Sequence, residues 1–223
     1  MLELESSMIF EKLLGEIKSV TKGGDLLLDV GCGQGEYLEL LEKTGIKCFG
    51  VDPLREVSIV PGANRMKSAG VEVFMIQASG EHLPFLDRMF DTVLCLSTLQ
   101  HVANQRKVLG EIARVLKANG NLICSVPTYK NANSAFRWKK APQYVTKAYD
   151  YDSFILEIET AGFKIGRVVG LEMYPPAGYE ALQRISSILS EGSMQRLMRM
   201  IFQLGDKMPK AANSALVLAN LHS

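Results

Sequence analysis

The sequence predicts an α/β fold in which helices cover both faces of a mostly parallel sheet of seven strands. Three observations support this prediction: short apolar runs alternate with amphipathic helical segments, the alternation repeats along the chain, and the first run ends in closely spaced glycines. Short continuous apolar runs are typical of strands that are buried on both faces of a parallel sheet. Their alternation with helices indicates right-handed crossovers and therefore a doubly wound sheet.

The first half of the chain supplies the most regular part of this alternation. Apolar residues at helical spacing predict a helix over Ser6–Val20, with Ser6 or Ser7 as its candidate cap. The elements expected after it are a strand at Leu26–Val30, a helix at Glu36–Lys43, a strand at Lys47–Val51, a short helix from about Pro61 to Ala69, strands at Val71–Gln77 and Asp91–Leu96, a helix at Asn104–Leu116 and a strand at Asn121–Val126. Asn119-Gly120 is expected to end the last of these helices.

The pattern is less regular downstream. The stretch Asn131–Thr146 is polar and aromatic, which favours an ordered loop with some helix. The elements expected beyond it are a helix at Asp152–Ala161, a strand at Phe163–Glu172, helices at Tyr179–Leu189 and Met194–Leu204, and a closing strand at Ala215–Leu221. Pro175-Pro176 breaks the chain, but no linker is long enough to separate a second domain, so residues 1–223 are expected to form a single domain.

The composition narrows the classes of function. Hydrophobic residues make up 47% and charged residues 22%, which is ordinary for a soluble globular protein. Twenty-five Lys and Arg against 24 Asp and Glu leave a formal charge of +1, which argues against nucleic acid as a partner without excluding a local basic patch. No apolar run reaches about 18 residues and no segment has the pattern of a signal peptide, so we expect neither a membrane span nor export.

The four cysteines argue against a metal site. None of them shows CxxC spacing, which a zinc site or a thioredoxin-type centre would need. Cys48, Cys95 and Cys124 lie in expected strands, where cysteine acts as a small hydrophobic residue. Free buried thiols suit a reducing compartment, so we expect a cytoplasmic protein.

The most informative stretch runs from a buried strand through three alternating glycines, Gly31, Gly33 and Gly35, directly into a helix. Glycine allows positive φ and lets a ligand approach the main chain closely, and the helix N-terminus offers unpaired N–H groups to an anionic group. Dinucleotide enzymes favour G-x-G-x-x-G, whose third glycine would fall at Glu36. A carboxylate there would also lie near a pyrophosphate, which argues against a nicotinamide dinucleotide.

Asp52, at the end of the second expected strand, is the acidic partner of this loop. A carboxylate in that position can accept hydrogen bonds from both ribose hydroxyls of an adenosine. The alternative is a helix cap, since Asp52-Pro53 also begins a turn. The glycine loop and the acid occur together, which favours ribose binding and an adenosine-type ligand.

Four segments of the first half share a family pattern: Asp29–Gly35 with its D-x-G-x-G-x-G spacing, Gln77–Phe85, Phe90–Val102 and Arg114–Gly120. In this order they resemble the glycine motif, the G-D-A-E-x-L-P-F segment, the fourth-strand segment and the R-V-L-K-P-G-G segment of class I methyltransferases that depend on S-adenosylmethionine (SAM). Together they cover about residues 24–127, and they most resemble the small-molecule branch called methyltransferase type 11.

This resemblance implies a Rossmann-like sheet with an antiparallel last strand. It implies an enzyme that transfers the methyl group of SAM to an O, N or C atom of an acceptor, expected to be a small molecule, and leaves S-adenosylhomocysteine. About residues 24–127 would then form the cofactor-binding core, and about residues 128–210 the substrate-side loops and lid helices.

The resemblance also assigns roles to the glycine loop and its acids. Gly31, Gly33 and Gly35 would line the methionine part of SAM. Asp29 would orient the loop and reach the SAM amino group through water. Asp52 would hold the ribose.

The adenine end departs from the family pattern at one position. The resemblance places Pro53 against the adenine and gives the backbone N–H of Gly80 to the adenine ring. The family usually has Asp where this chain has Ser79, and that Asp accepts a bond from the adenine amino group. Ser79 can also accept, so we expect SAM to bind with a weaker contact here; the alternative is that Ser79 is a simple loop residue.

The segment after the fourth expected strand faces the reacting methyl group in this family. Leu96 and Ser97 would lie against the methionine end, with Gln100 and His101 at the mouth through which substrate enters. His101 is the candidate general base, required only if the acceptor must lose a proton; the alternative is that it caps or packs at the start of the next helix. His82 and His222 have weaker claims.

The residues that bind the methyl acceptor are less clearly marked in the sequence. Aromatic residues after the fifth and sixth expected strands could wall a pocket or simply pack a long loop: Tyr129, Phe136, Trp138, Tyr144, Tyr149, Tyr151 and Tyr174. Arg137–Lys140 could bind an anionic acceptor or be a solvated charge run. The methionines of the last expected helix could face an apolar substrate, a partner or a membrane surface, or pack as core: Met194, Met198, Met200 and Met208.

Three other functions use a related glycine loop or the same fold. A methyltransferase acting on RNA, such as tRNA, stays open, although Leu96–Leu99 lacks the [DN]-P-P-[YF] pattern and Cys124–Pro127 the Pro-Cys pair of the nucleic-acid enzymes. A non-catalytic SAM-binding subunit of a complex stays open too, because a cofactor loop does not prove turnover. An NAD-dependent dehydrogenase would have Glu36 in place of its third glycine and would explain none of the three later family segments.

Overall fold

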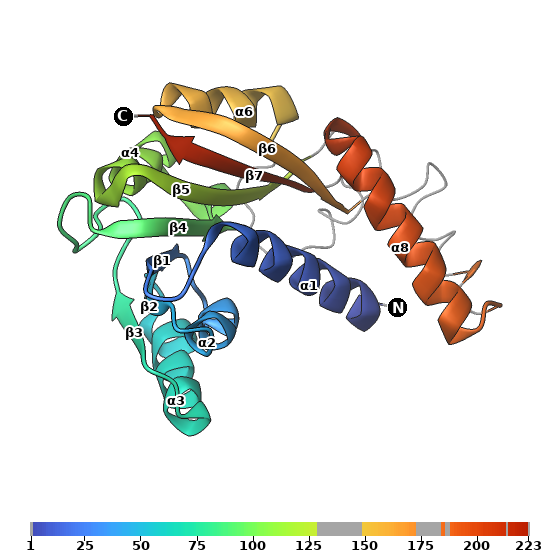
Figure 1. Ribbon diagram of the computed structural model, residues 1–223, viewed down its shortest axis with the longest axis horizontal. Helices are drawn as coiled ribbons and strands as arrows, with labels where there is room; N and C mark the ends of the chain where they lie inside the picture. The colour runs from blue at the N-terminus through green and yellow to red at the C-terminus, as the bar shows by residue number, and fades with distance from the viewer. Residues whose placement is uncertain (1, 129–148, 173–183, 186–187, 213, 223) are drawn as a thin grey trace.

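The computed structural model describes residues 2–128, 149–172, 184–185, 188–212 and 214–222, apart from the side chains of residues 2–6 and 172. These residues include one continuous sheet of seven strands (Figure 1). The strands are β1 (Leu26–Val30), β2 (Lys47–Asp52), β3 (Val73–Gln77), β4 (Phe90–Leu96), β5 (Leu116–Pro127), β6 (Phe163–Glu172) and β7 (Ser214–Leu221). Their order is β3-β2-β1-β4-β5-β7-β6, and every neighbouring pair is parallel except the two that β7 makes. The predicted mostly parallel sheet with an antiparallel last strand is confirmed.

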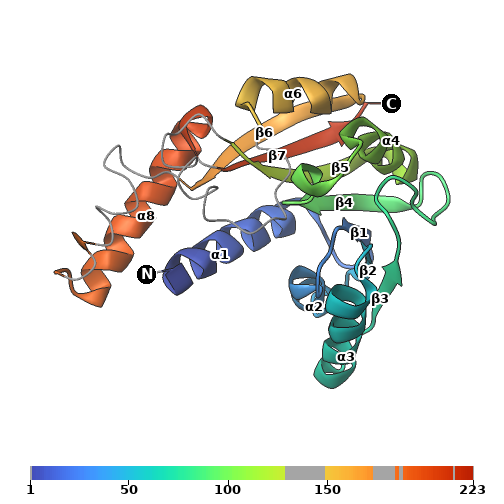
Figure 2. The ribbon, with the colours of Figure 1, turned by 180° about the vertical axis from the view of Figure 1, so that it is seen from behind.

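Helices cover both faces of this sheet, as predicted. They are α1 (Leu2–Val20), α2 (Glu36–Glu42), α3 (Val60–Ala69), α4 (Gln105–Val115), α6 (Tyr151–Thr160) and α8 (Glu191–Lys207). Helices α1, α2 and α3 lie on one face, and α4 and α6 lie on the other (Figures 1 and 2). The helix α8 lies beyond the end of β6, beside α1.

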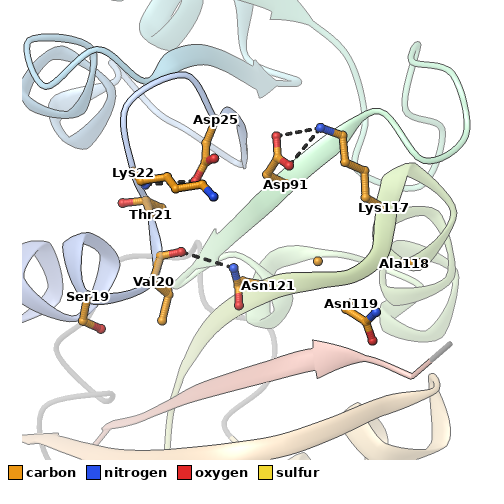
Figure 3. Close-up of a pocket in the computed structure, with 11 residues that line it drawn as sticks. Ser19, Val20, Thr21, Lys22, Asp25, Asp91, Lys117, Ala118, Asn119 and Asn121 are labelled. Carbon is orange, nitrogen blue, oxygen red and sulfur yellow. Dashed lines mark hydrogen bonds and ion pairs between the residues drawn. The ribbon is translucent and has the colours of Figure 1, made fainter.

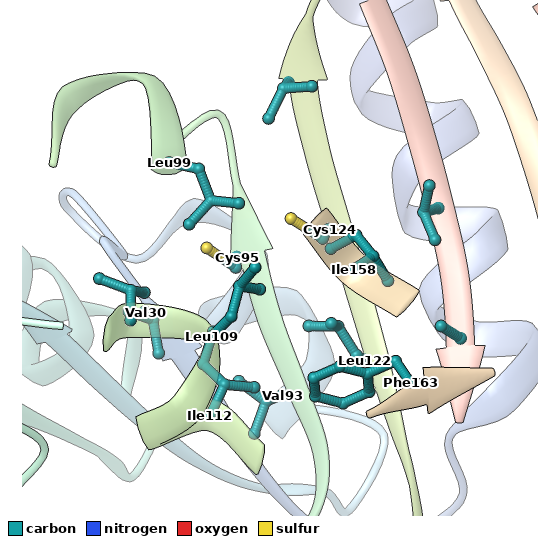
Figure 4. Close-up of a cluster of buried hydrophobic side chains, with 14 of the residues drawn as sticks. Val30, Val93, Cys95, Leu99, Leu109, Ile112, Leu122, Cys124, Ile158 and Phe163 are labelled. Atoms are coloured by element: carbon teal, nitrogen blue, oxygen red, sulfur yellow. The ribbon is translucent and has the colours of Figure 1, made fainter. Parts of the chain in front are cut away.

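The core under α4 is formed by the apolar residues that recur at helical spacing in the sequence. Asn104 caps the helix, its side chain accepting a hydrogen bond from the Lys107 N–H at 3.1 Å. The helix then buries Val108, Leu109, Ile112 and Val115, a spacing that places one apolar stripe against the sheet. Figure 4 shows this stripe meeting the strand residues beneath it. All four cysteines are buried free thiols, as the sequence predicts.

The structure corrects several boundaries. A π-helix at Arg55–Ile59 precedes α3, so the helical backbone begins before Pro61. The helix expected to run to Leu116 ends at Val115, and β5 starts at once with an irregular register. Asn119 takes a φ of 59° inside that irregular start, so the Asn119-Gly120 pair turns the strand and does not end the helix.

A close contact between glycines holds α8 on the sheet. A Cβ on Gly170 of β6 would lie 2.4 Å from the Gly205 carbonyl oxygen of α8, so the two backbones touch. Lys12 of α1 closes the same junction: its Nζ donates to the Gly170 carbonyl at 2.9 Å and pairs with Asp206 at 2.7 Å. Glycine is therefore required at this crossing, because any side chain would push α8 off β6.

Some expected elements lie outside the described residues. They are the loop at 131–146, most of the helix at 179–189, and the basic stretch 137–140. Within the described part of the chain, no helix is long and apolar enough to cross a membrane.

Candidate active site

The site is built where the carboxyl ends of β1, β2 and β4 meet. These strands are parallel neighbours, so the residues that follow them come to one edge of the sheet. The backbone N–H groups of Gly31 and Cys32 both donate to the Val51 carbonyl of β2, at 2.8 and 3.0 Å. The glycine loop is thereby fixed to the end of β2 as soon as it leaves β1.

Each glycine of the loop adopts the conformation that favours glycine. The φ angles of Gly31, Gly33 and Gly35 are 78°, 55° and 78°. A Cβ on Gly31 would lie 2.2 Å from Oγ1 of Thr98, so this glycine is required for both its angle and its contact. A Cβ on Gly33 would meet nothing within 4 Å, which leaves the outer side of the loop open to a ligand.

Asp29 is a buried carboxyl group beneath this loop. Its Oδ1 has no hydrogen-bond partner among the described residues, although the residue is only 3% exposed. Burial, followed by the charges of Glu36 and Asp52, raises the pKa of Asp29 to about 7. A buried polar atom without a partner is costly, so this oxygen fits a group that a bound molecule brings.

Asp52 closes the second side of the site. Its Oδ2 accepts from the Gly33 N–H at 3.1 Å, and its Oδ1 accepts from the Leu54 N–H at 2.8 Å. The second bond closes a local turn after β2, but Asp52 is not a helix cap, because Leu54 is the residue that caps the following helical segment. Each carboxylate oxygen can accept a further bond, so two ribose hydroxyls remain compatible with both contacts.

The residues predicted for the adenine end lie in the adjoining loops. Pro53 is exposed, and its carbonyl accepts from Gln77 Nε2 at 3.2 Å. Ser79 is exposed, and its Oγ accepts from the Glu81 N–H at 3.2 Å, a contact typical of a local turn. A Cβ on Gly80 would lie 2.9 Å from Cγ1 of Val30, so the loop passes directly over the end of β1.

Backbone strain marks the end of β4. Ser97 has a φ of 49°, and its N–H donates to the carbonyl and the Oγ of Ser125 at 3.0 and 3.1 Å. Positive φ is uncommon outside glycine and concentrates at functional sites. Leu96, which precedes it, is half-buried at the end of the strand.

Gln100 and His101 lie in a short 3-10 helix, Leu99–His101, that follows β4 at the same edge. Gln100 is buried, and the His101 side chain is exposed. The other histidines are elsewhere. His82 contacts Lys107 of α4, and His222 follows β7, whose antiparallel direction takes it to the opposite edge of the sheet.

Only two of the predicted pocket aromatics fall within the described residues, and both are core residues. Tyr149 is 1% exposed and donates from its hydroxyl to the Leu99 carbonyl at 3.4 Å. Tyr151 is buried at the start of α6. Packing explains these two; the others lie outside the described residues.

The sequence reasoning missed two features of the site. Thr98 packs against Gly31. No local sequence pattern predicts a contact between segments so far apart in the chain. Arg65 of α3 pairs with Glu36 at 3.1 Å and with Glu39 at 2.9 Å, which neutralises the acids at the start of α2. The charge spacing of these residues carries no signal of that pairing.

A pocket at the opposite edge of the sheet, of about 430 Å³, has a different character (Figure 3). Lys117 pairs with both oxygens of Asp91 at 2.8 Å, and Asp25 accepts from the Lys22 N–H at 2.9 Å. Asn121 donates to the Val20 carbonyl at 3.3 Å. The hydrogen-bonding groups that line this pocket are therefore already paired with one another. This argues against a ligand site here.

Comparison with known proteins agrees with the site. A family model described as a methyltransferase domain matches residues 28–124. An uncharacterized protein of Methanocaldococcus jannaschii is 33% identical over 166 residues, covering 74% of this chain and 67% of that protein. A ubiquinone biosynthesis O-methyltransferase of Ralstonia nicotianae is 29% identical over 177 residues, covering 74% of each chain.

The fold comparison points the same way. A SAM-dependent methyltransferase of Methanosarcina mazei superposes with a TM-score of 0.68 at 16% identity, covering 92% of this chain and 96% of that one. Its likeness concerns the fold. The family match and the O-methyltransferase relative, together with the glycine-loop edge, identify the chain as a member of the class I SAM-dependent methyltransferases, in the type 11 branch, with SAM as its cofactor.

Proposed function

We propose that this methyltransferase acts on a small-molecule acceptor at the carboxyl edge of β1, β2 and β4. The observation that carries the site assignment is the buried Asp29 oxygen that lacks a partner among the described residues, directly beneath an open glycine loop. The acceptor class is supported by the relatives named for ubiquinone biosynthesis and by the balanced charge of the chain.

The proposed cofactor contacts follow the fit of each residue. Asp29 takes the amino group through water, because its spare oxygen can accept a hydrogen bond and the negative charges of Glu36 and Asp52 beside it favour a cationic group. Gly31, Gly33 and Gly35 leave room along the methionine part. Asp52 accepts from the ribose hydroxyls with its remaining acceptor positions.

The remaining contacts are proposed for the two ends of the cofactor. Pro53 and the Gly80 N–H meet the adenine ring, with Ser79 as a weak acceptor beside them. The reacting end is bordered by Leu96 at the end of β4, by the strained Ser97 and by Gln100 in the short helix that follows.

When bound, SAM supplies an electrophilic methyl group that needs no further activation. The chain therefore has to align the acceptor, exclude water and, for some acceptors, remove a proton. The strained Ser97 and the Thr98 contact fix the backbone at the reacting end. His101 is proposed as the base, because it is exposed at this edge and follows β4 directly.

The test of the acceptor class is transfer of a trideuterated methyl group from labelled SAM to a metabolite extract and, separately, to total RNA, read by mass spectrometry. We expect label in the small-molecule fraction. Label confined to RNA would establish the RNA enzyme instead. Tight SAM binding with label in neither fraction would favour a non-catalytic subunit.

The base is tested with His101→Ala, with His222→Ala as the matched control at the opposite edge of the sheet. For an acceptor that must lose a proton, His101→Ala lowers kcat about 100-fold and removes the acidic limb of the pH profile. His222→Ala keeps the wild-type rate. Equal rates for both variants would leave His101 with a structural role only.

A further inference from the structure

The helix α8 has two apolar sides, of which only one is covered by another element, the helix α1. Its buried side consists of Met194, Met198, Ile201 and Phe202, packed against α1. Met200, Leu204 and Met208 form a second row, spaced four residues apart, and they are 61%, 45% and 52% exposed. Met200 and Leu204 lie one above the other on the helix, and Met208 follows as the residue that caps its C-terminus, so the three residues form one row. Exposed apolar residues are ordinarily scattered singly, so a continuous row indicates an interaction surface.

Three cations of α8 are exposed, and two of them adjoin this row. Arg196, Arg199 and Lys207 are exposed, and none forms an ion pair with another described residue. Arg196 lies one turn before Met200, and Lys207 lies three residues after Leu204, so both border the apolar row. The acid nearest the C-terminal end of α8, Asp206, is already paired with Lys12 at 2.7 Å. In a chain with a formal charge of +1, this helix face is therefore a local concentration of positive charge.

The surface lies at the edge of the sheet that holds the candidate active site. The glycine contact between Gly170 and Gly205 joins α8 to the carboxyl end of β6, and β6 runs in the same direction as β1 and β4. From that junction α8 projects away from the sheet (Figures 1 and 2). The exposed row is thus presented at the periphery of the molecule and on the active-site edge.

We propose that the α8 face formed by Met200, Leu204, Met208 and the flanking cations docks on a lipid membrane that carries anionic headgroups. Flexible Met and Leu side chains can enter the boundary between headgroups and acyl chains. The long Arg and Lys side chains can lay their apolar stems beside them and place their charges among the headgroup phosphates.

A protein partner fits this face less well. A stable protein interface needs about 800 Å² per partner, with a packed apolar centre depleted of charge. The α8 row is one residue wide and adjoined by Arg196 and Lys207. A shallow, laterally fluid, anionic surface matches a narrow apolar row with a basic flank, because it needs no complementary groove.

The test is flotation of the whole chain with vesicles of phosphatidylcholine alone and of phosphatidylcholine with one third phosphatidylserine. It is run at low salt and repeated at high salt, and it requires no methyl transfer, so its result is independent of the acceptor. We expect binding to the anionic vesicles, weak binding to the neutral ones, and loss at high salt. The variant R196Q/R199Q/K207Q should partition about 100-fold less, from roughly 1 kcal/mol per cation and a tenfold change per 1.4 kcal/mol.

The matched control is K47Q/K67Q/K164Q, which removes the same charge from exposed lysines on other surfaces. It should keep the wild-type partition, and circular dichroism verifies that both variants are folded. A second variant, M200S/L204S, should lose binding while keeping every charge. The proposal is overturned if the wild-type protein binds neither kind of vesicle, or if both triple variants lose binding equally. It is also overturned if sedimentation shows that the wild-type chain is a dimer and that M200S/L204S dissociates it.

Discussion

Asp29→Asn tests the electrostatics of the site through the stability of the protein. The wild-type carboxyl has a pKa of about 7 when folded and an ordinary value of 3.8 when unfolded. Between these values the folded state holds a proton that the unfolded state has released, so stability falls as pH rises, by about 1.4 kcal/mol per pH unit. Above the folded pKa the loss is complete, because both states are then ionised.

Between pH 5 and pH 8 the wild type should therefore lose about 2.5 kcal/mol of unfolding free energy through Asp29 alone. Asparagine has nearly the same size and does not titrate, so the variant lacks this contribution. The other titrating groups are common to both proteins, and they cancel in the difference.

The assay is urea unfolding of wild type and Asp29→Asn at pH 5 and pH 8, followed by circular dichroism. We expect the free-energy difference between the two proteins to change by about 2.5 kcal/mol over this interval, in favour of the variant at pH 8. A difference that stays constant within about 0.5 kcal/mol would refute the raised pKa of Asp29, and with it the desolvated, negatively charged surroundings assigned to this carboxyl.

Three further substitutions probe contacts on either side of the site. Gly31→Ala must displace Thr98 and adopt an unfavourable φ, so calorimetry should show SAM affinity reduced at least tenfold; unchanged affinity would contradict the loop geometry. Ser79→Asp supplies the acceptor usual in the family and should tighten SAM binding several-fold, whereas weaker binding would mean that this loop does not meet the adenine. Gly170→Ala should lower the unfolding free energy by about 1–3 kcal/mol in urea, since its Cβ would strike the Gly205 carbonyl; a neutral effect would show that α8 shifts freely.

The fold was predictable because its strands are locally encoded. The apolar runs at Leu26–Val30 and Phe163–Glu172 are strands with the same bounds in the structure. The π-helix at Arg55–Ile59 was not predictable, since its residues show no apolar period and Pro61 gave a plausible later start. Local patterns identify elements, and they set boundaries poorly where the register is irregular, as at the start of β5.

The candidate site divides in the same way. The positions of Gly31 and Asp52 were predictable, because a strand end and a helix start define them in the chain. The pairing of Gly31 with Thr98 and the contact of Gly170 with Gly205 were not, because each depends on how distant segments meet. The missing hydrogen-bond partner of Asp29 Oδ1 could likewise not be predicted, because it depends on the residues that surround this atom in the folded chain.

The most direct test of the account is calorimetric titration of wild type and Asp52→Asn with SAM, and with NAD as the competing ligand. We expect wild type to bind SAM at one site and NAD not at all. Asp52→Asn should weaken SAM binding by about 10-fold to 100-fold, because a charged acceptor for the ribose hydroxyls is lost. Equal SAM affinity in the two proteins, or NAD binding without SAM binding, would contradict the assignment of the carboxyl edge of β1 and β2 as the cofactor site.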